Sequence, residues 1–269
     1  MFYESKIIMP AESGIEKLEN IVDKLFEAYP TEQDRAFFAK KIHKPKLIAI
    51  FEDVQPNFHN AQLPLTYQIK IYLAPMKHGI GEFFNNTNKL NVNKNFFISA
   101  TNLDFKNTIL HEIVHAIQPF KKTSAKYKEM VTKGYFKGAY FNERIEIEAY
   151  LSQIAYELQK TFFSLSPAPF KIYYNRSKRQ LFLYEFEQWL KNENYDFSTI
   201  VQYSVVLKFW KRNPKTWREV KQKLYRLYLQ LYKKCTMMPS GDKYLHYNIN
   251  VDALKQIRKS PKYPALRYK

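Results

Sequence analysis

Two histidines four residues apart lie within the most regularly patterned segment of this chain. Residues 108–117 read Thr-Ile-Leu-His-Glu-Ile-Val-His-Ala-Ile. The apolar positions of the segment follow the i, i+3, i+4, i+7 spacing that buries one side of an α-helix: Leu110, Ile113, Val114 and Ile117. Because residues four apart share a helix face, His111 and His115 project side by side next to this apolar stripe.

The same segment carries signals for both ends of a helix. Asp104 or Asn107 can cap its start with a side-chain oxygen. Pro119 disfavours helical geometry at Gln118, so the helix should stop there after about three turns. One interpretation is a buried amphipathic helix whose histidines only form hydrogen bonds.

A second interpretation is a metal site. Two imidazoles on one helix face can bind a single divalent cation, and the pattern His-Glu-x-x-His is typical of zinc peptidases. It favours His111 and His115 as ligands of Zn²⁺ and Glu112 as the general base. A catalytic zinc site also needs a third protein ligand and one coordination position left open for water.

A downstream segment offers three carboxylates for the third ligand. Residues 140–158 predict a second helix with one apolar face: Ile147, Leu151, Ile154 and Leu158. Glu143, Glu146 and Glu148 lie on this helix. Glu146 and Glu148 flank the apolar stripe on opposite sides and Glu143 lies nearer its middle, so periodicity does not choose among them.

The two segments together resemble a known family. His-Glu-Ile-Val-His-Ala at 111–116, followed by a helix of the form E-I-x-A-Y at 146–150, is similar to the gluzincin branch of the zincin metallopeptidases, in particular to small versions found in phage and bacterial genomes. The resemblance covers about residues 80–158. It implies that Glu146 is the third zinc ligand, with Glu148 as the second choice.

The resemblance also implies an activity. A zincin hydrolyses peptide bonds with a zinc-activated water, and Glu112 would move the proton from this water to the leaving amine. The tetrahedral intermediate needs a hydrogen-bond donor for its oxyanion. Six residues have a suitable side chain and the sequence selects none of them: Tyr127, Tyr135, Tyr140, His43, His59 and His78.

The segments before the motif predict an α+β fold with a small sheet, which is the order of elements in zincins. We expect a helix over 13–29 that begins with a Ser13–Glu16 capping box, a short buried strand over 46–52, a half-exposed strand over 67–73, a loop or hairpin over 77–95 and a strand over 95–100. An edge strand of such a sheet can hold an extended peptide by backbone pairing.

Charge divides the chain into two regions. Residues 160–269 contain 23 Lys and Arg against 7 Asp and Glu, whereas residues 1–159 contain 20 against 18. We therefore expect a zincin-like metallopeptidase domain over 1–159 and a basic, mostly helical region over 160–269, separated near Ser166–Pro169 or packed as one unit. Helices are expected over 179–192, 198–211 and 214–235. Their basic residues could bind an acidic partner or nucleic acid, or only keep the protein soluble.

The remaining sequence features indicate where in a cell the protein is expected to act. Cys235 is the only cysteine, so no intrachain disulfide can form, and its thiol is expected to be a buried small hydrophobe. The apolar runs are shorter than the roughly 18 residues of a membrane span, and residues 1–12 do not resemble a signal peptide. We expect a cytoplasmic enzyme without membrane contact. The alternative is a non-catalytic protein that keeps a zincin fold, such as a component of a phage virion or a nucleic-acid-associated factor.

Overall fold

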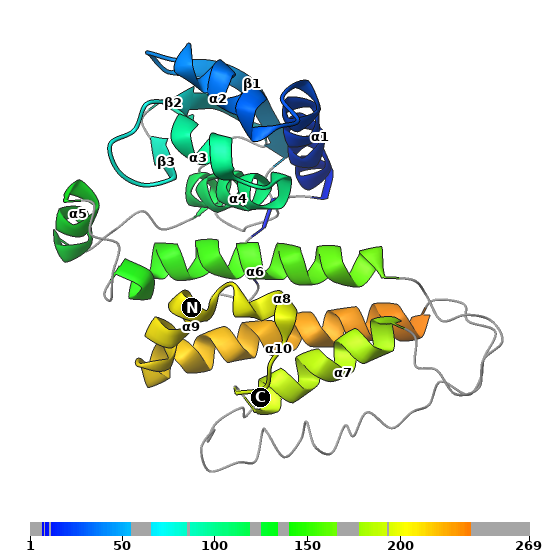
Figure 1. Cartoon of the computed structure of the whole chain (residues 1–269). Coiled ribbons are helices and arrows are strands. Elements are labelled where there is room, and N and C mark those ends of the chain that lie inside the picture. The colour runs from blue at the N-terminus through cyan, green and yellow to red at the C-terminus, as the bar shows by residue number, and fades with distance from the viewer. Residues whose placement is uncertain are drawn as a thin grey trace. The chain divides into compact units, whose positions relative to one another are not determined.

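The computed structural model describes residues 7, 9–10, 12–54, 66–84, 87–118, 125–133, 140–165, 178–192 and 194–237. These residues form a mixed α+β structure in which helices predominate and one sheet has four strands (Figure 1). The chain divides into two compact units, one comprising Ile7–Tyr156 and the other containing the C-terminal region from Glu157. The prolines at 166–169, where a boundary was expected, lie outside the described residues.

The first unit contains the sheet. Its elements follow the order α1 (Glu12–Ala28), α2 (Glu32–Lys40), β1 (Lys46–Val54), β2 (Thr66–Ala74), β3 (Gly81–Phe84), β4 (Lys89–Asn93), α3 (Lys94–Ser99), α4 (Asn102–Ile117), α5 (Ala125–Thr132), a 3-10 turn (Tyr140–Asn142) and the start of α6 (Arg144–Ser164). The strand order is β1-β2-β4-β3, so β1 and β3 are the edges of the sheet that the structure describes. β2 pairs with β4 in parallel, and the other two pairings are antiparallel.

The predicted strands over 46–52 and 67–73 and the predicted hairpin are confirmed as β1, β2 and the pair β3–β4. Residues 46–52 of the edge strand β1 are mostly not buried: Leu47 and Ile50 are 46% and 47% exposed, and among these seven residues only Phe51 is fully buried. The pairing of β1 with β2 also shifts register between Leu47 and Ala49.

The predicted strand over 95–100 is wrong, because these residues belong to helix α3. Asn93 caps this helix by accepting a hydrogen bond from the backbone N–H of Asn95. The apolar residues there pack as a helix: Phe97 is fully buried, and its ring lies 5.3 Å from the Phe105 ring between centroids, at an interplanar angle of 59°.

Helix α1 begins at Glu12, so Ser13 lies inside the helix and does not cap it. Helix α2 was not expected, although Thr31 and Asp34 form a capping box at its start.

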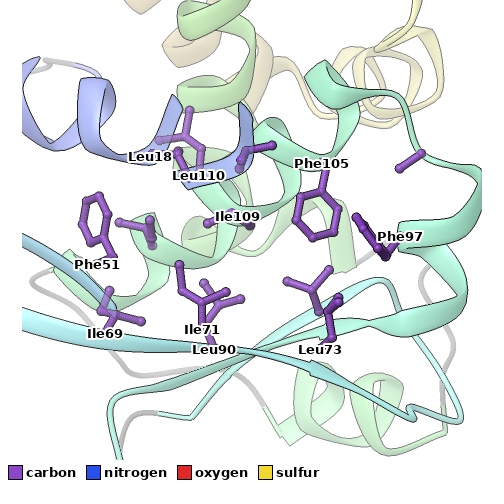
Figure 2. Packing of buried hydrophobic residues seen from close by; sticks show 14 of the residues in the cluster. Leu18, Phe51, Ile69, Ile71, Leu73, Leu90, Phe97, Phe105, Ile109 and Leu110 are labelled. Atoms are coloured by element: carbon purple, nitrogen blue, oxygen red, sulfur yellow. The ribbon is translucent and has the colours of Figure 1, made fainter. Parts of the chain in front are cut away.

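The hydrophobic core of this unit lies between the sheet and helices α1 and α4. Figure 2 shows Ile69, Ile71 and Leu73 pointing from β2 toward the helices. Leu18 of α1 and three residues of α4 lie opposite them and are fully buried: Phe105, Ile109 and Leu110. This packing fixes the side of α4 that faces the sheet and therefore the direction of its other side chains.

Helix α4 is longer at its start than the sequence predicted. Thr101 is the N-cap and forms a capping box with Asp104, so neither Asp104 nor Asn107 caps the helix. The predicted end is confirmed: Gln118 leaves the helix with φ −63° and ψ 132°, as expected for a residue before proline.

The second unit is helical in the part that the structure describes. Its elements after α6 are α7 (Lys178–Lys191), α8 (Ser198–Val201), α9 (Ser204–Lys211) and α10 (Pro214–Met237). The helix predicted over 198–211 is broken at Gln202 and Tyr203, where the buried Tyr203 hydroxyl donates to Glu157 at 2.7 Å. The predicted apolar face of α10 is confirmed, and all of its residues are buried: Trp217, Val220, Leu224, Leu227, Tyr228 and Leu231. Among the described helices, none has the length and low polarity needed to cross a bilayer.

Candidate metal centre

Three side chains from two helices converge in the first unit. His111 and His115 project from α4, and Glu146 projects from the first turn of α6. His111 Nε2 lies 3.1 Å from Glu146 Oε2, and His115 Nε2 lies 3.4 Å from Glu146 Oε1. One ligand atom from each residue lies within 4.8 Å of the others. The structure therefore brings together the three residues that the sequence favoured as metal ligands.

The two separations between Glu146 and the imidazoles are close to those of a tetrahedral cation site. Two ligand atoms bound to one zinc at about 2.05 Å lie about 3.3 Å apart in a tetrahedron, and the two separations given above fall on either side of this value. Glu146 has no solvent exposure and His111 is 7% exposed, so the carboxylate is held away from water. A buried carboxylate is stable only with a compensating charge or hydrogen bonds. A small cation between the three side chains would supply that charge.

Gln118 fixes the protonation of one imidazole. Its Nε2 donates to the backbone carbonyl of Ile145 at 2.6 Å, which orients the amide because a carbonyl only accepts. Its Oε1 lies 3.1 Å from His115 Nδ1, so Nδ1 carries the proton and donates. In neutral His115 the Nε2 lone pair then faces Glu146. Two electron-rich atoms facing each other repel, and a metal ion between them removes the repulsion.

His111 is held by ring contacts. Its ring meets the His115 ring edge-on at 4.8 Å between centroids and the Tyr150 ring at 4.6 Å. Its Nδ1 is buried and has no hydrogen-bond partner among the described residues. Burial, assisted by the nearby carboxylates of Glu146 and Glu112, raises the pKa of Tyr150, so its hydroxyl stays protonated at neutral pH.

Glu112 lies against the edge strand β3. Its carboxylate accepts a hydrogen bond from the backbone N–H of Phe83. A Cβ atom at Gly81 would lie 2.8 Å from Glu112 Cγ, so only glycine leaves room for the side chain as it is placed. Burial raises the pKa of Glu112 to about 7; His115 acts in the opposite direction, whereas Glu146 and Glu82 add to the increase. A carboxyl group that titrates near neutrality is suited to accepting and returning a proton.

The other candidate ligands do not join this group. Glu143 precedes α6 and is half-buried, and Glu148 is buried but is not one of the three converging residues.

None of the six candidates for oxyanion stabilisation is selected by the structure. His43 and His78 are exposed, and Tyr140 is half-buried against Phe141. Tyr135, His59 and the side chain of Tyr127 lie outside the described residues.

Sequence reasoning missed two residues that shape the site, Gln118 and Gly81. Pro119 predicted that the helix ends at Gln118, but it gave no information on where the Gln118 side chain points. Gly81 lies in the segment 77–95, which was predicted only as a loop or hairpin. Its contact with Glu112 joins residues that are far apart in the sequence and depends on the packing of β3 against α4.

Comparisons of the chain with protein-family models, curated proteins and solved structures found no match.

Proposed function

We propose that this protein is a zinc-dependent peptidase of the gluzincin type. The observation that carries the proposal is the convergence of His111, His115 and Glu146, whose ligand atoms all lie within 4.8 Å of one another. The separations of Glu146 from the two imidazoles are close to those between ligands of a tetrahedral zinc ion. Three protein ligands leave a fourth position for water, whereas structural zinc sites are usually closed by four protein ligands. Retention of Glu112 beside the ligands favours catalysis, because a structural site has no use for a general base.

The residues of the site have distinct tasks in this mechanism. His111, His115 and Glu146 would hold a zinc ion, which would lower the pKa of a bound water molecule and polarise the scissile carbonyl. Glu112 accepts the proton of the attacking water and returns it to the leaving amine. The N–H of Phe83 holds the Glu112 carboxylate in place for this transfer. The protonated hydroxyl of Tyr150 lines the same site.

The position of β3 supports a peptide as the substrate. β3 is an edge strand, and its residues Gly81 and Phe83 contact Glu112. A peptide that extends beside this edge by backbone pairing would pass next to the proton acceptor. The site would then cleave within a chain, as an endopeptidase does.

The metal content of purified protein tests the ligand set. We expect one zinc per chain in the wild type and a large loss in Glu146→Gln. Glu148→Gln and Glu143→Gln are the matched controls, because they remove a carboxylate from the same segment without touching the site. Equal zinc content in all four proteins would overturn the assignment of Glu146.

Peptide turnover tests the activity. Glu112→Gln should keep its zinc and lose about 10²–10⁴-fold in rate, the usual contribution of a general base. The assay is cleavage of a quenched fluorescent peptide library by the zinc-loaded proteins. A wild type that binds zinc but cleaves no peptide would favour a non-catalytic protein with a zincin fold.

A second candidate activity is binding of an acidic partner or nucleic acid by the basic region. The second unit contains a cavity of about 580 Å³, and its lining residues include the aromatic Trp189 and Phe197 and the basic Lys208, Lys211 and Arg212. Neutralising Lys208 and Arg212 together should weaken binding of a polyanion such as heparin. The same change at Lys215 and Arg218, which are exposed and do not line the cavity, is the control. Binding that does not weaken with added salt would argue against this activity.

A further inference from the structure

Gln118 connects the two helices that carry the metal-ligand side chains. It is the residue at which α4 ends, and it is 2% exposed. One end of its amide accepts from His115 of α4, and the other end donates to the carbonyl of Ile145, the residue before Glu146 in α6. A single buried side chain therefore contacts one ligand directly and the backbone beside another.

The backbone geometry at the end of α4 makes this bridge possible. Gln118 leaves the helix with an extended ψ of 132° while its N–H still bonds to the carbonyl of Val114. Its side chain therefore meets His115, which lies one turn back. The contact between Gln118 and His115 therefore depends on α4 ending at Ile117.

We propose that Gln118 is a positioning residue that sets the metal affinity of the site. It selects the His115 tautomer in which Nε2 is free to bind a metal, and it holds the first turn of α6 at the distance that brings Glu146 to both imidazoles. The inference rests on the proposed zinc site and goes beyond it, because Gln118 is not itself a ligand. Partners of this kind typically change metal affinity by 10–100-fold when they are removed.

Gln118 acts on one of the two histidines only. His111 Nδ1 has no hydrogen-bond partner among the described residues, and ring contacts hold its imidazole. His115 is the imidazole whose tautomer is fixed by a side chain. Removing the amide should therefore change the tautomer and orientation of His115 and leave those of His111 unchanged.

The test compares Gln118→Met with Gln153→Met. Methionine is similar in length to glutamine and makes neither hydrogen bond. Gln153 is a matched control, because it is buried and its Nε2 joins the same two helices by donating to the carbonyl of Asn107 at 2.9 Å. Both variants lose a buried contact between α4 and α6, but only Gln118 contacts a metal-ligand side chain.

Two measurements separate positioning from general stability. Zinc affinity, measured by competition with a chromogenic chelator, should fall 10–100-fold in Gln118→Met and less than threefold in Gln153→Met. Long-range ¹H–¹⁵N spectra of the metal-free proteins should place the His115 proton on Nδ1 in the wild type and in Gln153→Met. In Gln118→Met that proton should redistribute to Nε2.

The outcomes distinguish this inference from the proposed function. Equal zinc affinities for the two variants, or an unchanged His115 tautomer in Gln118→Met, would overturn the role of Gln118. Failure of the wild type to bind zinc would overturn the proposed function instead, and the tautomer measurement would still test the hydrogen bond. Neither measurement uses peptide cleavage, so the result does not depend on finding a substrate.

Discussion

Replacement of Gly81 by alanine should reduce catalysis much more than stability. The added Cβ would lie 2.8 Å from Glu112 Cγ and 2.9 Å from Glu112 Oε1. Ordinary contacts of a Cβ begin at about 3.4 Å, so the Glu112 side chain must retreat by about 0.6 Å or more. The backbone of Gly81 has no positive φ, so alanine itself is not strained there.

The displacement of the Glu112 side chain determines how much stability and how much activity are lost. Overpacking of a buried site costs about 1–3 kcal/mol, and replacing glycine in a compatible backbone returns about 0.4–1 kcal/mol. We therefore expect a loss of about 1 kcal/mol in the free energy of unfolding. Displacing a proton acceptor by a large fraction of an ångström can cost up to about 10²-fold in rate. A fall of about 10–100-fold in kcat/KM is expected.

The assay measures zinc content, urea unfolding and peptide turnover for Gly81→Ala, Glu112→Gln and the double variant. Zinc content should not change, because Gly81 does not contact the ligands. In the Glu112→Gln background the alanine should cause little further loss of turnover, since both changes act through one side chain. Full turnover by Gly81→Ala at normal zinc content would show that β3 does not position Glu112.

Three further predictions concern stability and reactivity. Thr101→Ala removes the N-cap of α4 and should lower the free energy of unfolding by about 1 kcal/mol in urea titrations; a change below 0.3 kcal/mol, about the error of such titrations, would contradict the capping argument. Arg35→Met removes donors to the carbonyls of Ile98, Tyr29 and Pro30 and should cost about 2–3 kcal/mol, seen as a lower Tm, whereas an unchanged Tm would show that these bonds add nothing. Burial raises the pKa of the Cys235 thiol, so iodoacetamide should modify it more slowly at pH 8 than it modifies free cysteine, and an equal rate would count against this pKa shift.

Local signals in the sequence predicted much of the secondary structure of the first unit. The apolar spacing around His111 and His115 predicted a helix, and alternation from Tyr67 to Leu73 predicted a strand, because burial of one side imposes these periods. The prediction failed for residues 95–100, which were expected to form a strand. The cap formed by Asn93 is a local signal for the helix that begins there instead.

The periodicity of the sequence does not determine which residues form the site. Three glutamates were available on the helix predicted over 140–158, and the choice depends on which side of that helix faces α4. The family resemblance favoured Glu146, and the structure brings Glu146 to the two imidazoles. Gln118 and Gly81 escaped notice because their partners lie 27 and 31 positions away, at Ile145 and Glu112. Such pairs depend on tertiary packing.

The strand β1, at one edge of the described sheet, combines exposed apolar side chains with two features that disfavour pairing with another strand. Its side chains Leu47 and Ile50 are exposed, which could attract a strand from another copy of the chain. The break in register between Leu47 and Ala49 distorts the row of backbone groups, and Lys46 places a positive charge at the same end. A flat incoming strand would meet both an irregular spacing and a charge, which disfavours fibril-like stacking at high protein concentration.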